Sequence, residues 1–435
     1  MASRSGLLSR QSVRDNLSFA LLQWCFWSAF GLIFGFLVAY LEWAGYSNFQ
    51  TGTVMALVAL VGIVGQPVWG YAADRVGSTR LVMRIAMVGA AISSVGLLLY
   101  GDKAFIAVLL FSLLGAFTLQ PLPPLIDSWT VRTNSARGGV NYGVTRAMGS
   151  IGFSVTVAVV GNLMDSWGMN VMFYGNLIMM GVTFLVMSLI WEVKVGNADA
   201  RSAPAPTTDE DGEPVAAVAG RTTGTGDPDG TTGPGRQPNP IELVRNPDIV
   251  AFLVIAMLIF TAFRAAQIYL PMLVTARGGS NSHLGMALSV MAISEVPMLA
   301  LSSLLLKRFE DVTVLLWSFI FFTLRIVLHL VVTSPWGVVV IQAAQGISFA
   351  LFLPASVHFM HRVAPEGLKT TAQALAAASS FGVGSVVASF LGSVVIEYGS
   401  IFDVYRYGGI LAAVTVVVYY LTIYRRRHRR RAAAG

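Results

Sequence analysis

The sequence predicts an all-α membrane protein whose twelve transmembrane helices form two pseudo-symmetric halves of six. Its composition is the first reason: of 435 residues, 55% are hydrophobic and only 12% are charged, whereas about 25% of a soluble domain is charged. Secondly, the apolar residues fall into separate runs of about 20 residues, the length that spans a bilayer. Thirdly, one block of residues recurs in the second half of the chain. A soluble enzyme is therefore excluded, and the single cysteine, Cys25, excludes a disulfide scaffold.

Each apolar run is expected to form a helix. In hydrocarbon the backbone must satisfy its hydrogen bonds within the segment, and these runs are too long for barrel strands. In chain order the predicted spans are 17–41, 51–72, 81–100, 104–126, 143–164, 171–192, 248–273, 284–306, 312–333, 336–358, 371–396 and 404–424.

The distribution of Lys and Arg predicts the orientation, because cytoplasmic loops are enriched in them. With the N-terminus inside, 23 of the 29 basic residues fall on the inner side and three fall outside, Lys103, Arg277 and Arg406. The remaining three, Arg146, Arg264 and Arg325, lie within the apolar spans. We therefore expect a multi-pass protein of the cell membrane with both termini in the cytoplasm and no cleavable signal peptide. The tail Arg425–Arg431 is expected to hold the last helix at an anionic inner leaflet, and not to bind nucleic acid.

Residues 196–247 differ in composition from the spans on either side. They are rich in Gly, Pro, Thr and Asp, and such a segment cannot bury enough apolar surface to fold. The expected organisation is an N-terminal half over 1–195, a disordered cytoplasmic linker over 196–247, a C-terminal half over 248–424 and a basic tail over 425–435.

The two halves carry matching residues. The block Gly45-Tyr-Ser-Asn-Phe-Gln-Thr-Gly52 returns as Gly278-Gly-Ser-Asn-Ser-His-Leu-Gly285 at an offset of 233. Further pairs, at an offset of 231, are Gly115 with Gly346, Pro123 with Pro354, Gly161 with Gly392, Gly168 with Gly399 and Tyr174 with Tyr405. A shared glycine-rich composition is the alternative explanation. Duplicated six-helix halves are typical of secondary transporters, in which the substrate site lies between the halves near the midplane.

The loop between the second and third helices carries a family resemblance. Gly70-Tyr-Ala-Ala-Asp74-Arg75-Val-Gly77 resembles the signature loop of the major facilitator superfamily, although Ser78 and Thr79 stand where basic residues are usual. The resemblance covers the whole chain outside the linker. It implies that Gly70, Asp74, Arg75 and Gly77 form a conformational latch, in which Asp74 meets a helix end of the other half. A tight glycine turn in a basic loop is the simpler alternative.

A narrower resemblance is to proton-coupled permeases related to lactose permease and phenylpropionate permease. It is carried by the segment Tyr142–Phe153, by Asp127 and by the surroundings of Glu295 and Arg325. It implies that Asp127, Arg146 and Glu295 contact the substrate. The tenth helix departs from that group, because 342–345 reads Gln-Ala-Ala-Gln where lactose permease has a His and a Glu of its proton path.

Ionisable residues inside membrane spans are costly and are functional candidates by default. At 1.5 Å per residue, Glu295 and Arg325 lie roughly 16 and 20 Å into their helices, near the middle of a ~30 Å core. Arg264 falls in the outer half, and hydropathy places Asp127 and Arg146 near the inner ends of their helices. We expect all five to contribute to substrate binding.

The charges of these residues constrain the substrate. With both acids ionised, the five sum to +1, which favours an anionic or strongly hydrogen-bonding solute. Symport requires one acid whose protonation is coupled to substrate binding; Glu295 is the first choice and Asp127 the second. On the first helix Gln23, Trp27, Phe30 and Phe34 share one face, so Trp27 is a further substrate-binding candidate, with lipid contact or packing as the alternative.

The sequence thus predicts a secondary transporter that takes up a small organic solute, such as an organic anion or a glycoside, by proton-coupled symport and alternating access. The alternative is an efflux antiporter, disfavoured because the end of the fifth helix lacks the Gly-Pro pair of the superfamily's drug antiporters. No enzyme activity or metal is expected, because the sequence shows no nucleophile, metal or phosphate-loop constellation. No cofactor is expected either, since the proton gradient supplies the driving force. The expected partners are the small-molecule substrate, protons and lipid, and the expected state is a monomer.

Overall fold

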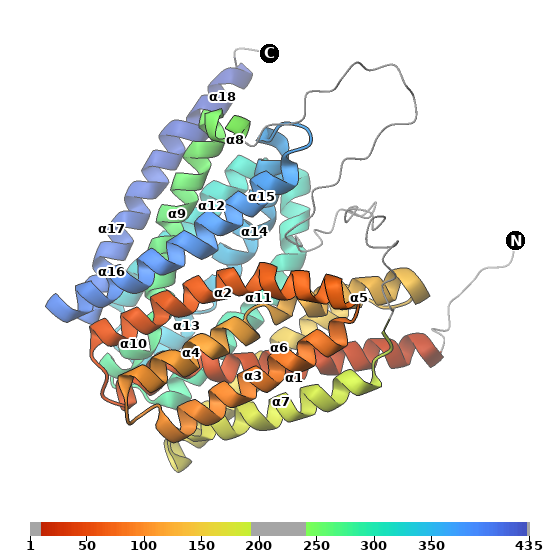
Figure 1. Cartoon of the computed structure of the whole chain (residues 1–435). Helices are drawn as coiled ribbons and strands as arrows, with labels where there is room; N and C mark the ends of the chain where they lie inside the picture. The colour runs from red at the N-terminus through yellow and green to blue at the C-terminus, as the bar shows by residue number, and fades with distance from the viewer. Residues whose placement is uncertain (1–9, 193–240, 433–435) are drawn as a thin grey trace, which may run out of the picture.

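The computed structural model describes residues 10–192 and 241–432, and in this part of the chain every regular element is a helix. Twelve helical segments there are long and apolar enough to cross a membrane (Figure 1). Each coincides with one of the twelve predicted spans, so the predicted fold class is confirmed. The predicted linker lies outside the described residues except for its last part, which includes the short helix α8 (Ile241–Arg245).

The first six spans make up what we call the N half. Its fourth span consists of two consecutive helices, α4 and α5. The elements are α1 (Arg10–Trp43), α2 (Asn48–Val76), α3 (Thr79–Tyr100), α4 (Phe105–Leu119), α5 (Leu122–Arg137), α6 (Tyr142–Trp167) and α7 (Val171–Leu189).

The last six spans make up the C half, in which several spans are interrupted. The elements are α9 (Pro247–Ile268), α10 (Leu270–Ala276), α11 (Asn281–Arg308), α12 (Asp311–Val331), α13 (Pro335–Ile341), α14 (Ala344–Val363), α15 (Lys369–Ala377), η2 (Ala378–Val383), α16 (Gly384–Tyr398), α17 (Ile401–Tyr419), η3 (Tyr420–Tyr424) and α18 (Arg425–Ala432). The predicted basic tail therefore begins as α18, which continues the last span.

The repeated block has the same local structure in both halves. Gly45 and Gly278 both have positive φ, 79° and 76°, a conformation that glycine adopts without steric cost. Ser47 and Ser280 then start α2 and α11, each in a capping box with the residue three positions later. The recurring residues thus serve the same turn and helix start in each half.

The halves meet mainly through two helix pairs, α6 with α11 and α2 with α16, and α1 adds smaller contacts with α10 and α11. Six crossings return each half to the side on which it started, so the start of α1 and the end of α18 lie on one side of the molecule (Figure 1). We call this side the termini face and the opposite side the far face. Glycines make the close contacts: Gly161 lies against Asn281 and Gly285, and Gly52 lies against Ser389 and Ser393.

These inter-half contacts lie toward the far face. On α6 they run from Ser154, which donates to the carbonyl of Ser289 at 3.1 Å, to Asp165 near the end of the helix. In Figure 1 the helices of the two halves diverge toward the termini face. The structure therefore holds the halves together at the far face.

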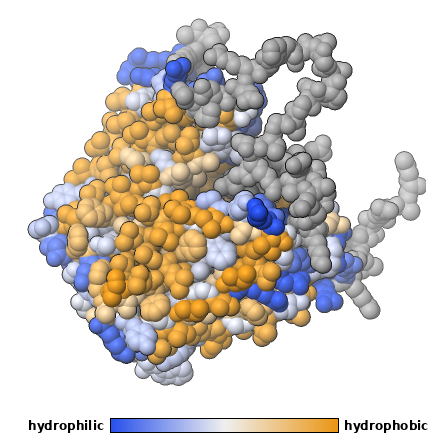
Figure 2. Space-filling model, in the orientation of Figure 1, coloured by the Kyte–Doolittle hydropathy of each residue, from blue (hydrophilic) through white to orange (hydrophobic). Residues whose placement is uncertain are grey.

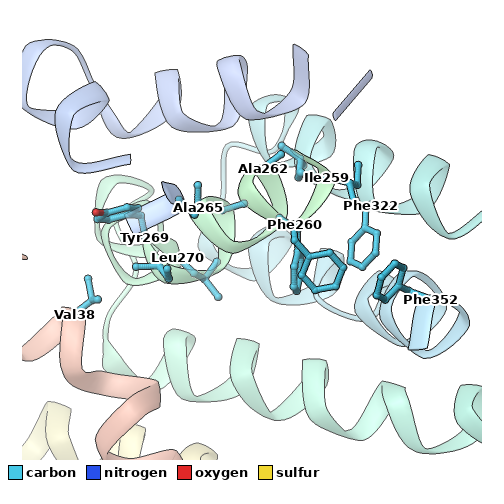
Figure 3. Packing of buried hydrophobic residues seen from close by; sticks show 14 of the residues in the cluster. Val38, Ile259, Phe260, Ala262, Ala265, Tyr269, Leu270, Phe322 and Phe352 are labelled. Atoms are coloured by element: carbon cyan, nitrogen blue, oxygen red, sulfur yellow. The ribbon is translucent and has the colours of Figure 1, made fainter. Parts of the chain in front are cut away.

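The core of the C half is largely aromatic. Phe260 packs against Phe352, with ring centroids 4.7 Å apart, and against Phe322 at 5.8 Å (Figure 3). On the outside, apolar side chains cover most of the visible surface, while hydrophilic residues gather near the helix ends (Figure 2). An apolar exterior of this kind suits contact with lipid.

Candidate functional site

Three helices of the N half converge on Asp127 of α5. Gln23 of α1 donates to the Asp127 carboxylate at 3.1 Å, and Trp27, one turn along α1, donates to the carboxamide oxygen of Gln23 at 2.9 Å. From α6, Tyr142 hydrogen-bonds to Asp127 and the charge of Arg146 lies within electrostatic reach of it. The Arg146 guanidinium carbon is 4.4 Å from the centroid of the Trp27 ring. Residues four positions apart on α1 and on α6 supply the contacts, because that spacing puts them on one face.

The helices around Asp127 and Arg146 extend further than the predicted spans. Helix α5 continues for ten residues past Asp127 to Arg137, about 15 Å at 1.5 Å per residue. Arg146 is only four residues into α6, yet it stacks on Trp27, which is seventeen residues into α1. The apolar runs end before the helices do, because the last turns of α5 are polar and α1 begins before its apolar run; the depth of Asp127 and Arg146 in the membrane stays a prediction.

In the C half a buried arginine is surrounded by carboxamides. Arg325 of α12 is 3% exposed. It donates to the side-chain oxygens of Gln345 on α14 and of Gln342 in the turn between α13 and α14, and to that of Gln267 on α9 at 3.2 Å. His329, one turn further along α12, contacts the Arg325 carbonyl at 2.7 Å and Gln342 at 3.1 Å. Arg325 is thereby fixed from three helices.

Glu295 of α11 connects the two clusters. It accepts a hydrogen bond from Gln345 at 3.2 Å, so it is joined to Arg325 through a carboxamide that bonds to both. Glu295 also interacts electrostatically with Arg146 of the N half. Asp127, Arg146, Glu295 and Arg325 thus form a sequence of alternating charges that crosses between the halves, which we call the four-charge chain. Its formal charges sum to zero.

Arg264 is placed differently from the other four candidates. Its Nε donates to Ser385 of α16 at 2.9 Å, and within the described residues no contact joins it to the four-charge chain. The five charged residues predicted to line one site are therefore not all together. Four form the four-charge chain, whose charges cancel, and Arg264 lies apart from them between α9 and α16.

The predicted aromatic face of α1 is present. The Trp27 and Phe30 ring centroids are 5.3 Å apart and those of Phe30 and Phe34 are 4.6 Å apart. All three side chains are half-buried. Gly149 of α6 lies directly against the Trp27 ring, and small residues allow helices to approach closely at such points. The aromatic face begins beside Arg146 and follows α1 toward the far face.

The loop that resembles the latch motif lies at the termini face. Gly77 closes α2 with a φ of 70°. Asp74 forms an ion pair with Arg132 of its own half at 3.9 Å, and Arg75 donates to Tyr71 at 2.8 Å. Gly70 has open space around its Cα. In this conformation the described ion pair of Asp74 lies within the N half, which agrees with the divergence of the halves at this face. Contact of Asp74 with the other half stays a prediction for another conformation.

Sequence reasoning missed the uncharged members of the site as functional residues. His329 was not considered, and Gln342 and Gln345 were noted only as a departure from the lactose permease pattern. A usable signal is nevertheless present: Gln342 and Gln345 are three residues apart and Arg325 and His329 four apart, spacings that predict one face of an apolar helix for each pair.

Residues 16–407 match the model of the MFS_1 like family. The chain is 29% identical over 414 residues to maltose permease of Geobacillus stearothermophilus, covering 95% of this chain and 94% of that protein. It is 25% identical to the uncharacterized transporter YwbF of Bacillus subtilis (strain 168), covering 84% and 82%.

Solved structures of transporters share the fold. The nucleoside transporter NupG superposes with a TM-score of 0.75 at 16% identity, covering 95% of this chain and 98% of that one. A D-xylose-proton symporter gives a TM-score of 0.63 at 14% identity, covering 94% and 97%. At these identities the likeness concerns the fold alone.

Proposed function

The chain belongs to the MFS_1 like family and is a secondary transporter of the major facilitator type, and from this premise we propose that it takes up a neutral sugar or glycoside together with a proton. The termini face carries the excess of Lys and Arg and is assigned to the cytoplasm. With the halves joined at the far face, the structure then corresponds to an inward-facing state of an alternating-access cycle in the cell membrane.

The observation that carries the proposal is the four-charge chain between the halves. Its acids and bases balance, so it offers charged and carboxamide hydrogen-bonding groups without a net charge. A neutral solute with many hydroxyl groups suits such a site, and Trp27 with Phe30 and Phe34 supplies an apolar wall for the face of a sugar ring. Ligand sites commonly combine aromatic walls with a few placed polar groups. The relative named maltose permease supports the same substrate class.

Glu295 is the proposed proton carrier. When ionised, its charge acts on that of Arg146 across the two halves, and such an attraction is stronger in a partly dry site than in water. When protonated, it loses this attraction and keeps only hydrogen bonding through Gln345. The protonation state of one side chain thereby alters the attraction between the halves. Proton-coupled transport requires such a link between protonation and the relative movement of the halves. Asp127, which is held by Gln23 and Tyr142 within the N half, is the second choice.

Arg264 favours a second candidate substrate, a small organic anion. Its guanidinium is hydrogen-bonded to a serine and stands outside the four-charge chain. An anionic group would supply the bidentate partner that arginine geometry suits.

The test is uptake by proteoliposomes under an imposed inward proton gradient, using labelled maltose, a monosaccharide, a nucleoside and a set of carboxylates. Accumulation of a sugar that collapses on addition of a protonophore would support the proposal. Accumulation of a carboxylate alone would support the second candidate. Proton-driven export of solute would contradict uptake and favour the antiporter alternative.

A further inference from the structure

One side chain of the N half binds the start of a helix in the C half. Asp165, near the end of α6, accepts hydrogen bonds from the backbone N–H groups of Asn281 and Ser282 at 2.9 and 3.0 Å. The hydroxyl groups of Ser280 and Ser282 also hydrogen-bond to its carboxylate. These residues form the first turn of α11, so an acid of one half caps a helix of the other.

The chemistry of this contact is that of helix capping. The first N–H groups of a helix have no partner within the helix, and the helix dipole places partial positive charge there. Ser280 and His283 provide the local capping box of α11. Asp165 adds a negative charge and bonds to the next two N–H groups, and both bonds require the ends of α6 and α11 to be adjacent.

The backbones of α6 and α11 approach closely just below this cap. Gly161 lies against the carbonyl of Asn281 and the Cα of Gly285, and Gly285 in turn lies against the carbonyl of Val157. The cap therefore closes one end of a tight seam.

The pseudo-symmetric pair α2 and α16 closes the far face without such a cap. There the rings of Phe49 and Phe390 meet with centroids 6.1 Å apart, and Ser47 caps α2 with Gln50 of its own helix. At an offset of 231, the position equivalent to Asp165 is Ile396. The polar closure is thus specific to the α6–α11 side.

We propose that Asp165 is the far-face latch of this transporter, stabilising the state in which the halves are closed at the far face and losing its partners when that face opens. This inference rests on the alternating-access function proposed above. Capping side chains contribute about 0.5–2 kcal/mol, which corresponds to an about two- to thirtyfold change in the ratio of far-closed to far-open molecules.

The test measures distances between spin labels in the purified full chain. One pair, Asn170→Cys and Thr333→Cys, reports on the far face; a second, Ser135→Cys and Glu366→Cys, reports on the termini face. All four positions are exposed, and the buried Cys25 is replaced by alanine. Asp165→Asn, which keeps the shape but removes the charge, and Asp165→Ala are compared with Asp102→Asn. Asp102 is an exposed acid whose charge acts on Tyr40 and Tyr46 of its own half.

In both Asp165 variants, we expect more molecules with a long distance between the far-face labels and fewer with a long distance between the termini-face labels. Asp102→Asn should behave like the parent. Asp165→Glu, which keeps the charge, should restore part of the far-closed population. Unchanged distances in folded Asp165→Asn and Asp165→Ala would overturn the latch. The readout needs no substrate, so failure of the sugar-uptake proposal would be seen separately.

Discussion

Glu295 is the residue at which the two halves and the proposed proton meet. Replacing it by glutamine keeps the size and the hydrogen-bonding capacity toward Gln345 but fixes the neutral state. We expect Glu295→Gln to abolish accumulation of substrate against a gradient, by at least about tenfold, while leaving exchange of substrate at equal concentrations. The measurement is proteoliposome uptake with and without a proton gradient.

Glu397→Gln is the matched control, because Glu397 is exposed at the far end of α16. It should transport like the parent. If Glu295→Gln still accumulated substrate with the full proton dependence, the role of proton carrier would pass to Asp127.

Arg325 is expected to matter for stability as well as for transport. Arg325→Met keeps the apolar stem of the side chain but leaves the side-chain oxygens of Gln342, Gln345 and Gln267 without their shared donor. An unsatisfied buried polar group costs about 1–3 kcal/mol, so we expect a marked fall in the thermal unfolding temperature in detergent. Arg264→Met, which removes one described bond to Ser385, should lower it less. Equal unfolding temperatures for the two variants would contradict this role of the carboxamide cluster.

Four of the five charged candidates could be predicted from the sequence and are brought together by the fold, whereas their uncharged partners could not. A charge within an apolar run is conspicuous by itself, since it is so costly in hydrocarbon. A glutamine is tolerated in many helices, and its importance depends on what faces it from another helix. Gln345 belongs to the site because it hydrogen-bonds to both Arg325 of α12 and Glu295 of α11.

At the scale of the helices, every predicted span exists, but its boundaries follow packing more than hydropathy. The predicted span 104–126 continues to Arg137, since the polar turns of α5 contact Asp15 and Asp74 through Arg137 and Arg132. Hydropathy detects the lipid-facing length of a helix and not its extension beyond the apolar layer. The same limit applies to Asp127 and Arg146, which hydropathy places near the inner ends of their spans.

The α6–α11 seam depends on glycine at position 285. A methyl group there would overlap the carbonyl of Val157, so we expect Gly285→Ala to separate the two helices and to destabilise the far-closed state, at a typical cost of about 1–3 kcal/mol for overpacking. The far-face label pair and the unfolding temperature measure this. Gly181→Ala is the control, because a Cβ at Gly181 would meet no atom within 4 Å. A parent-like Gly285→Ala would mean that the seam is adaptable.

At the scale of the molecule, the halves are held together by the α2–α16 and α6–α11 pairs. We therefore expect a chain cut between residues 215 and 216, at an inserted protease site, to stay assembled. The measurement is co-elution of the two fragments from size-exclusion chromatography in mild detergent, with the uncut chain as reference. Separation of the fragments would show that the connection between the halves is needed to keep them together.

The repeat predicted two related halves but carried no information on how they are tilted. In the structure, particular long-range contacts accompany the tilt, such as the ion pair of Asp74 with Arg132 at the termini face and the cap that Asp165 forms on α11 at the far face. Those contacts join residues that are 58 and 116 positions apart. No local pattern along the chain points to them.

The balanced four-charge chain has a consequence for energetics at the membrane. If a neutral sugar enters with one proton, each turnover carries one net positive charge inward. The membrane voltage then contributes about 2.3 kcal/mol per 100 mV in addition to the pH difference, enough for a roughly fiftyfold accumulation from voltage alone. Each turnover would therefore lower the membrane voltage slightly. An inside-negative voltage without any pH gradient should be sufficient to drive uptake.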